Sequence, residues 1–224
     1  MMTELEPKPA DLHLQDCPDW VYLLQEFDTI YRTGSSGGSP IIRSHRKRVR
    51  DRLSSVVKSN PVIINKPSVN RPVTAHLSRA LDLGERGVMQ GMTRALKKVR
   101  ASLNWEYGYE KLPKSLINKY AFCEILGPAG PVKADNLIIG FVLFAPSTTY
   151  PQHNHPEIEE SYISISGSWS ENNSAVFSPG SLIFNTPGAK HRITTGDIDP
   201  CLLAYAWSGP KERLIAPGMN FSRK

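Results

Sequence analysis

The chain has 224 residues, of which 40% are hydrophobic and 8% aromatic, as expected for a globular protein of one or two domains with a buried core. No apolar run is long enough to span a bilayer, and residues 1–15 lack the apolar stretch of a secretory signal, so we expect a cytoplasmic protein without membrane segments. The three cysteines are widely spaced, which excludes a disulfide framework and favours reduced thiols.

The net charge of +6 arises in the first half of the chain, and its densest part is residues 43–52, with five arginines and one lysine. Such a cluster can mark a nucleic-acid surface. Apolar residues recur at helical spacing in and around the same stretch, namely Ile42, Val49, Leu53, Val56 and Val57. A helix with a solvated basic face explains both features, so we favour that interpretation and predict no nucleic-acid partner.

The first half has the apolar periodicity of helices. Residues 19–33 carry their apolar side chains on one helical face, with Asp19 as the expected N-cap, and a second helix is predicted over 41–58. Pro72 suits the first turn of a further helix, whose pattern continues through 88–103. Three glycines are expected to interrupt this long segment: Gly84, Gly87 and Gly91.

From residue 119 the pattern changes to short β-rich runs separated by Gly, Pro, Asn and Asp. The runs cover 120–126, 136–145, 161–166, 175–177, 181–184, 191–195 and 201–207. The almost wholly apolar run 138–144 indicates a strand that is covered on both faces. We therefore predict an α+β protein with a helical N-terminal region (1–115) and a C-terminal antiparallel β-barrel or double-sheet roll (116–224). The polar segment 211–224 is expected to pack loosely.

Three histidines and one glutamate in the β-rich half form a candidate metal site. His153 and His155 alternate, so on an extended strand both imidazoles point to the same side. Glu160 stands on the next strand-like run, and His191 follows a Pro-Gly turn. A lone His-x-His pair is more often polar surface, but imidazoles with one carboxylate suit a divalent transition metal and leave coordination sites open for substrate. Zinc, manganese, iron and nickel all accept these ligands, so the identity of the metal stays open.

The spacing of these residues resembles the two motifs of the cupin superfamily. The matching positions are His153-x-His155-x4-Glu160-x6-Gly167, and then Gly180 followed by Pro187-Gly188-x-x-His191. Three positions depart from the motifs: Ser147 replaces a glycine, Pro187 comes one residue late, and Thr195 replaces a closing asparagine. The resemblance implies the double-stranded β-helix of a cupin, a fold that hosts many chemistries.

A narrower resemblance is to the cupin-type dimethylsulfoniopropionate (DMSP) lyases, most of all to the type called DddL. It rests on Tyr150-Pro151-x-His153-x-His155-Pro156, on Glu160-x-Tyr162 and on the ending 200–207, together with the helical first half and the total length. The resemblance implies that the small-molecule substrate is DMSP, which these enzymes cleave to dimethyl sulfide and acrylate.

The same resemblance implies a metal-dependent β-elimination in which the metal binds the substrate carboxylate. The metal ligands that it implies are His153, His155, Glu160 and His191. Tyr162 would be the catalytic base and Tyr150 a pocket residue. Relatives often place the glutamate four residues after the second histidine, which here is Glu159. We prefer Glu160, because its spacings to Tyr162 and Gly167 both match.

The sulfonium group of such a substrate needs housing, and aromatic faces attract onium cations. The sequence offers several candidates without selecting among them: Trp105, Tyr107, Tyr109, Trp169, Phe184, Tyr205 and Trp207.

Other functions fit the same ligand set. One is a different cupin metalloenzyme, such as a dioxygenase or a small-sugar isomerase, and another is a non-catalytic, metal-dependent small-molecule sensor. The Glu-x-Tyr pair favours the lyase, because the ligand set alone does not distinguish these functions. The oligomeric state stays open, with a homo-oligomer among the alternatives.

Overall fold

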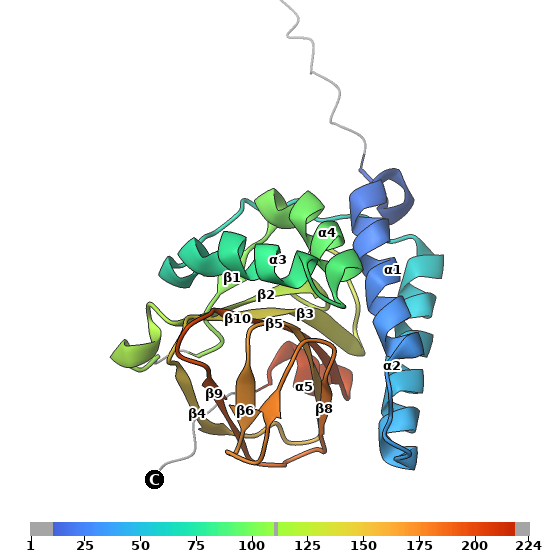
Figure 1. The fold of residues 1–224 in the computed structure, drawn as a ribbon. Coiled ribbons are helices and arrows are strands. Elements are labelled where there is room, and N and C mark those ends of the chain that lie inside the picture. Colours follow the sequence, from blue (N-terminus) through green and yellow to red (C-terminus); the bar gives the residue numbers. More distant parts are fainter. Residues whose placement is uncertain (1–10, 110–111, 218–224) are drawn as a thin grey trace, which may run out of the picture.

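Four α-helices precede the strands in the computed structural model of the protein, which describes residues 11–109 and 112–217 (Figure 1). They are α1 (Pro18–Thr33), α2 (Pro40–Ser59), α3 (Leu77–Glu85) and α4 (Gln90–Val99). α2 begins after Ser39, whose Oγ accepts a hydrogen bond from the backbone N–H of Ile42, and ends where Asn60 adopts a left-handed conformation. The break between α3 and α4 lies in the glycine-rich segment, as predicted.

The predicted N-cap of the first helix was wrong. α1 begins at Pro18, so Asp19 lies inside the first turn and Cys17 is the N-cap, without a side-chain hydrogen bond. Proline suits that first position because its missing N–H would have no partner within the helix. Similarly, Pro72 begins a 3-10 turn (Pro72–His76) that leads into α3.

The strands form two antiparallel sheets. Their bounds are β1 (Trp105–Glu106), β2 (Tyr120–Leu126), β3 (Leu137–Phe144), β4 (Thr149–His153), β5 (Glu159–Ser166), β6 (Trp169–Glu171), β7 (Val176–Phe177), β8 (Leu182–Asn185), β9 (His191–Thr195) and β10 (Cys201–Ser208). The larger sheet has the order β1-β2-β3-β10-β5-β8, and the smaller has β4-β9-β6-β7. The helical first part followed by antiparallel sheets confirms the predicted fold class, although within the described residues no strand of one sheet pairs with a strand of the other to close a barrel.

Three strands were absent from the sequence prediction, namely β1, β4 and β6. β1 and β6 have only two and three residues, too few to set an alternating pattern. β4 contains Pro151 and shows a register shift between Tyr150 and His153, so its pattern is interrupted.

The larger sheet is covered on both faces. All residues of β3 and β10 are buried, as predicted for the apolar run at 138–144. On one face, alternate residues such as Cys123, Phe141 and Ala204 join the core formed with α1 to α4. On the other face, residues such as Val142 and Tyr205 form a second cluster between the sheets. This second cluster surrounds the candidate site.

The basic side of α2 is only partly a solvated face, which corrects part of the interpretation of residues 43–52: Arg43 and Lys47 are exposed, but three other arginines bind neighbouring elements. Arg46 Nε donates to the carbonyl of Tyr31 over 2.9 Å, and Arg52 Nη1 donates to Ser208 Oγ over 2.7 Å. Arg48 Nε donates to a carboxylate oxygen of Glu159 over 3.0 Å. These arginines therefore fasten α2 to α1 and to the ends of β5 and β10 in the larger sheet.

The segment after β10 also differs from its prediction. α5 (Lys211–Ile215) follows the last strand, and Leu214 is only 3% exposed, so one side chain anchors this part of the chain while residues 211–213, 215 and 216 stay exposed. Residues 218–224 of the predicted segment lie outside the described residues.

No helix within residues 11–109 and 112–217 combines the length and apolar character needed to cross a membrane.

The domain boundary after residue 115 stays a prediction. β1 lies before that boundary and pairs with β2 after it, with Trp105 opposite Cys123. The core between the helices and the larger sheet also contains side chains from both parts.

Two aliphatic residues on α2 test how the helix packs. Leu53 is 1% exposed, whereas Ile41 on the same helix is 58% exposed. We expect Leu53→Ala to lower the free energy of unfolding by about 2–5 kcal/mol, because it leaves a cavity in the core. Ile41→Ala should change it by less than about 0.5 kcal/mol. Urea unfolding followed by circular dichroism measures both, and equal effects would show that α2 does not pack in this orientation.

Candidate metal centre and active-site cavity

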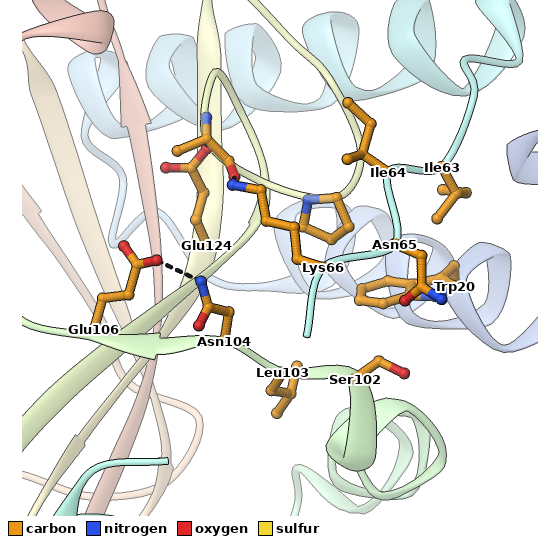
Figure 2. Close-up of a pocket in the computed structure, with 12 residues that line it drawn as sticks. Trp20, Ile63, Ile64, Asn65, Lys66, Ser102, Leu103, Asn104, Glu106 and Glu124 are labelled. Atoms are coloured by element: carbon orange, nitrogen blue, oxygen red, sulfur yellow. Dashed lines mark hydrogen bonds between the residues drawn. The ribbon is translucent and has the colours of Figure 1, made fainter. Parts of the chain in front are cut away.

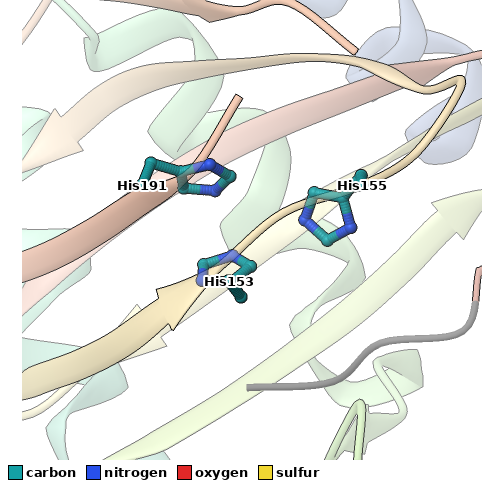
Figure 3. A group of neighbouring side chains, drawn as sticks. All are labelled: His153, His155 and His191. Carbon is teal, nitrogen blue, oxygen red and sulfur yellow. The ribbon is translucent and has the colours of Figure 1, made fainter. Parts of the chain in front are cut away.

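Three histidines converge between the two sheets (Figure 3). His153 ends β4 and lies opposite His191 in register on β9, with their ring centroids 4.1 Å apart. His155 follows two residues after His153. One ring nitrogen from each histidine lies within 4.8 Å of the others, and all three residues are buried. The structure therefore brings together the three histidines that the sequence analysis selected.

Glu160 approaches the same point from β5, in the larger sheet. Its Oε2 lies 2.9 Å from His191 Nε2, and its Oε1 lies 3.6 Å from His155 Nε2. Two ligand atoms bound about 2.1 Å from one metal ion lie roughly 3.0–3.4 Å apart at angles of 90–110°. The observed separations lie just outside this range on either side, and the group of ligand atoms within 4.8 Å of one another contains the three histidines without Glu160.

The hydrogen bonds of the histidines test whether these residues fit a metal ion. His153 Nδ1 lies 2.9 Å from the carbonyl of Pro151, and His191 Nδ1 lies 3.1 Å from that of Ala189. A carbonyl only accepts, so these Nδ1 atoms carry protons, and a neutral ring then offers the lone pair of its Nε2. Among the described residues, both ring nitrogens of His155 are buried without a hydrogen-bond partner, and His191 Nε2 faces Glu160 Oε2. Buried orphan nitrogens and an adjacent carboxylate are what a divalent transition metal would satisfy.

At neutral pH the site holds two neutral imidazoles, the Glu160 carboxylate and a protonated His191, whose proton a bound cation would displace. Burial, helped by the neighbouring His191, lowers the pKa of His153 to about 3, and burial also lowers the pKa of His155. Burial alone would raise the pKa of Glu160, but His191 and His155 outweigh it and hold that pKa well below its ordinary value. Burial disfavours charge on His191, yet the Glu160 carboxylate raises the pKa of His191 to about 9.

Two neighbours in the sheet orient Glu160. Trp207 lies opposite it on β10 and donates its Nε1–H to Oε1 over 2.7 Å. Asn185 lies opposite it on β8 and donates to Oε2 over 3.4 Å. Sequence reasoning missed Asn185 altogether and considered Trp207 only as housing for a cation. Neither residue has a sequence signal for this role, because strand pairing alone brings them to Glu160.

Glu159 points away from the histidines. Its carboxylate meets Arg48 and lies 3.1 Å from the Nδ1 of His45, both on α2. The following Ser161 also faces the helices, with its Oγ 2.8 Å from His45 Nε2 and 2.7 Å from the Tyr31 hydroxyl. Strand alternation thus separates two adjacent glutamates, one toward the helices and one toward the histidines.

Tyr162 and Tyr150 are both buried beside the cluster. Tyr162 stands two residues after Glu160 on the same face of β5, and burial followed by the Glu160 charge raises the pKa of its phenol well above 10. The Tyr150 ring lies 4.8 Å from that of His153. Its hydroxyl is 2.8 Å from the hydroxyl of Tyr109 and 3.3 Å from that of Tyr120, so it belongs to a network of phenols.

A cavity of about 640 Å³ connects these residues. His153, Glu160 and Tyr162 line it, and of the aromatic candidates for a cation subsite the cavity is lined by Tyr107, Tyr109, Tyr205 and Trp207. The other three candidates do not line it. Trp105 packs in the core beneath the helices, Trp169 packs on Phe177, and the ring of Phe184 lies 4.7 Å from that of His45. The structure therefore reduces the seven aromatic candidates for a cation subsite to four, a choice that the sequence left open.

The departures from the cupin motifs leave the site intact. Ser147 stands where the motif has glycine and adopts a left-handed backbone with φ 52°. Thr195, which replaces the asparagine, donates from Oγ1 to the carbonyl of Ala145 over 3.0 Å and accepts from the N–H of Thr148 over 3.0 Å. The changes therefore fall on turns and supporting hydrogen bonds, away from the histidines and Glu160.

Comparison with known proteins identifies the family of this chain. Residues 45–203 match the family model described as dimethylsulfoniopropionate lyase. A Cereibacter sphaeroides protein with the provisional name dimethylsulfoniopropionate lyase DddL is 65% identical over 221 residues, which cover 99% of this chain and 95% of that protein.

Two solved structures share the fold at low sequence identity. A chain from crystal structures of the DMSP lyases RdDddP and RnDddQII aligns with a TM-score of 0.67 at 21% identity and covers 92% of this chain and 98% of its own. DMSP lyase DddQ from Ruegeria pomeroyi aligns with a TM-score of 0.64 at 22% identity, covering 86% and 92%. These likenesses show a shared fold, while the sequence match shows the family. The chain belongs to the dimethylsulfoniopropionate lyase family and is a carbon–sulfur lyase.

Proposed function

We propose that the protein cleaves DMSP to dimethyl sulfide and acrylate by β-elimination at the cavity between the two sheets. The observation that carries the proposal is a buried cluster of three histidines with Glu160 beside it, of which His153 and Glu160 line a substrate-sized cavity, in a chain of this family. The sequence match to the Cereibacter sphaeroides relative extends over nearly the whole chain and supports the same substrate. The cytoplasmic location and a homo-oligomeric state stay predictions.

The chemistry explains why such residues are needed. The sulfonium leaves as neutral dimethyl sulfide, so the difficult step is removal of a proton next to an anionic carboxylate. His153, His155, His191 and Glu160 are the proposed metal ligands. A divalent cation held there would supply positive charge for the substrate carboxylate and would lower the cost of removing the adjacent proton. Neutral imidazoles preserve more of that positive charge than thiolates would.

Tyr162 is the proposed general base. It shares a strand and a face with Glu160, so its phenol lies beside the place where the substrate carboxylate would be held. Without a nearby cation its phenol stays protonated at neutral pH, because burial and Glu160 raise its pKa. A divalent cation bound by the histidines and Glu160 would lower the pKa of Tyr162 and so oppose the effects of burial and of the Glu160 charge. Tyr150, which already contacts other phenols, is proposed to shape the pocket.

The direct test is incubation of the purified protein with DMSP. We expect equal amounts of dimethyl sulfide and acrylate, without oxygen uptake, measured by gas chromatography and liquid chromatography. Oxygen consumption would instead indicate a dioxygenase, and isomerisation of small sugars would indicate an isomerase. Stoichiometric binding of metal and DMSP without products would indicate a sensor.

Removal of the metal tests the ligand assignment. Chelation should abolish activity, and a divalent transition metal should restore it. His155→Ala should lower the bound metal by at least about ten-fold and the activity with it, because the buried site loses one ligand. His76→Ala, which changes a histidine outside the cavity, is the matched control and should keep both. Elemental analysis measures the metal, and full activity of His155→Ala without bound metal would reject the site.

Tyr162→Phe tests the base. The substitution keeps the ring but removes the oxygen, so metal content and melting temperature should stay near those of the wild type. The turnover rate should fall by about 10²–10⁴-fold, the usual contribution of a positioned base. Tyr150→Phe, which removes a hydroxyl elsewhere in the pocket, should affect KM more than kcat. Near-normal turnover of Tyr162→Phe would make Tyr150 the next candidate base.

A further inference from the structure

A row of paired residues crosses the larger sheet from the candidate base to a second carboxylate. Tyr162 on β5 lies opposite Tyr205 on β10, Tyr205 lies opposite Gly140 on β3, and Gly140 lies opposite Glu124 on β2. Directly paired residues on neighbouring strands point to the same face of a sheet. Glu124 and Tyr162 both line the cavity, which confirms that this face is the inner one.

Gly140 has no side chain, so the space above it in this row is available to a neighbouring side chain. A Cβ atom at that position would approach the Tyr205 ring and its hydroxyl to 2.9 Å, so the Tyr205 side chain lies over the glycine, toward β2. Burial, followed by the charge of Glu124, raises the pKa of Tyr205 well above 10, which is consistent with that placement. The cavity therefore continues from the histidine cluster past Tyr205 to Glu124.

The Glu124 carboxylate is held in a fixed position. Its Oε1 accepts hydrogen bonds from the backbone N–H groups of Ala129 (2.7 Å) and Gly130 (2.6 Å). Lys66 Nζ donates to the carbonyl of Ala129 over 2.8 Å and supports the turn, and a small pocket of about 30 Å³ beside it is also lined by Glu124 and Glu106 (Figure 2). Among the described residues, Oε2 of Glu124 accepts no hydrogen bond from another side chain or backbone group, which leaves one carboxylate oxygen for a ligand.

We propose that Glu124 is a specificity-determining residue that attracts the cationic sulfonium end of the substrate and so orients the zwitterion in the cavity. This inference rests on the proposed function. DMSP carries a carboxylate at one end and a sulfonium at the other, which need opposite charges from the protein. The histidine cluster with its metal would serve the carboxylate end, and Glu124 supplies the negative charge at the other end.

The distance between Glu124 and Tyr162 suits a substrate whose two charged ends bind at opposite ends of the cavity. Three steps of about 4.8 Å between neighbouring strands put the Cα atoms of Glu124 and Tyr162 roughly 14 Å apart along the sheet. The long side chains at both ends take up part of this interval and leave room for a short zwitterion. Phe122, Tyr205 and Trp207 line the cavity between the two ends. In such a partly apolar setting, a carboxylate acts on a cation over several ångströms more strongly than it would in water.

The charge of Glu124 changes with pH near its pKa of about 6, which an experiment can reach. Burial raises the pKa of Glu124 to about 6, although the hydrogen bonds from the backbone N–H groups of Ala129 and Gly130 lower it. The charged groups near it are Glu106 on the neighbouring β1, which raises the pKa, and Lys133 after the turn, which lowers it. Glu124 is thus ionised above about pH 6 and becomes neutral as the pH falls through that value, so its attraction for a cation should disappear on the acid side.

Glu124→Gln tests the proposal with two unreactive ligands that differ only in charge. β-Alanine betaine carries a trimethylammonium group, and 4,4-dimethylpentanoate carries the neutral tert-butyl group of the same shape. Glutamine keeps the oxygen that accepts from the turn. In metal-loaded enzyme, calorimetry should show the betaine weakened by about ten-fold and dimethylpentanoate unchanged, as expected for a charge interaction across several ångströms. For DMSP, KM should rise while kcat stays near that of the wild type.

Glu106→Gln is the matched control, because it neutralises a carboxylate on the adjacent strand that does not line the large cavity. It should leave the affinities for both ligands unchanged. Equal weakening of both ligands by Glu124→Gln would show a structural role and overturn the proposal, as would no change in either.

Should Glu124→Gln fail to fold, the wild-type enzyme provides the second measurement. The preference for the betaine over dimethylpentanoate should fall between about pH 8 and about pH 5, because the carboxyl becomes neutral. A preference independent of pH would overturn the inference. A protein that binds the betaine selectively but releases no dimethyl sulfide would reject the proposed function alone, whereas an active enzyme whose selectivity Glu124 does not affect would reject this inference alone.

Discussion

The alternation of side chains along β5 is the constraint on which the rest of the structure depends. Successive residues of a strand face opposite sides, and this strand is buried on both. Glu159 and Ser161 face the helices and bind Arg48, His45 and Tyr31. Glu160 and Tyr162 face the cavity. The contacts that fasten the helices to the sheet therefore also hold the strand that presents the candidate catalytic groups, which gives the helical half a role in positioning the site.

Burying the Glu160 carboxylate is costly unless its oxygens are satisfied, and the structure does this from both neighbouring strands. Trp207 donates from one side and Asn185 from the other, while His191 supplies positive charge. Asn185 also donates to Glu171 over 2.9 Å, so the network extends from the larger sheet to the smaller one. A carboxylate held in this way has little freedom to turn, which is what a metal ligand on a rigid element requires.

The cavity is asymmetric in its charges, and this asymmetry matches the chemistry of a zwitterion. Imidazoles and one carboxylate gather where the two sheets meet, and a second carboxylate lies three strands away on the inner face. The wall between them is aromatic and includes Tyr205 and Trp207, whose ring centroids are 5.8 Å apart. Such a surface suits a methylated cation. The cation has no hydrogen-bond donors that the wall would need to satisfy, and the aromatic faces attract its positive charge.

The sequence by itself determined the period of the elements and the residues of the candidate site. The change from helical to alternating patterns predicted an α+β chain, because local burial imposes those periods. Strand alternation predicted that the rings of His153 and His155 point the same way, and the resemblance to the cupin motifs added His191, which the pairing of β4 with β9 brings to them. Only the tertiary structure decided which of Glu159 and Glu160 faces the histidines, because both lie at the start of one strand and the covering helices set its register. Trp207, Asn185 and Glu124 could not be predicted for the same reason: each reaches the cavity through pairing between strands far apart in the chain, and that pairing is a property of the folded sheet.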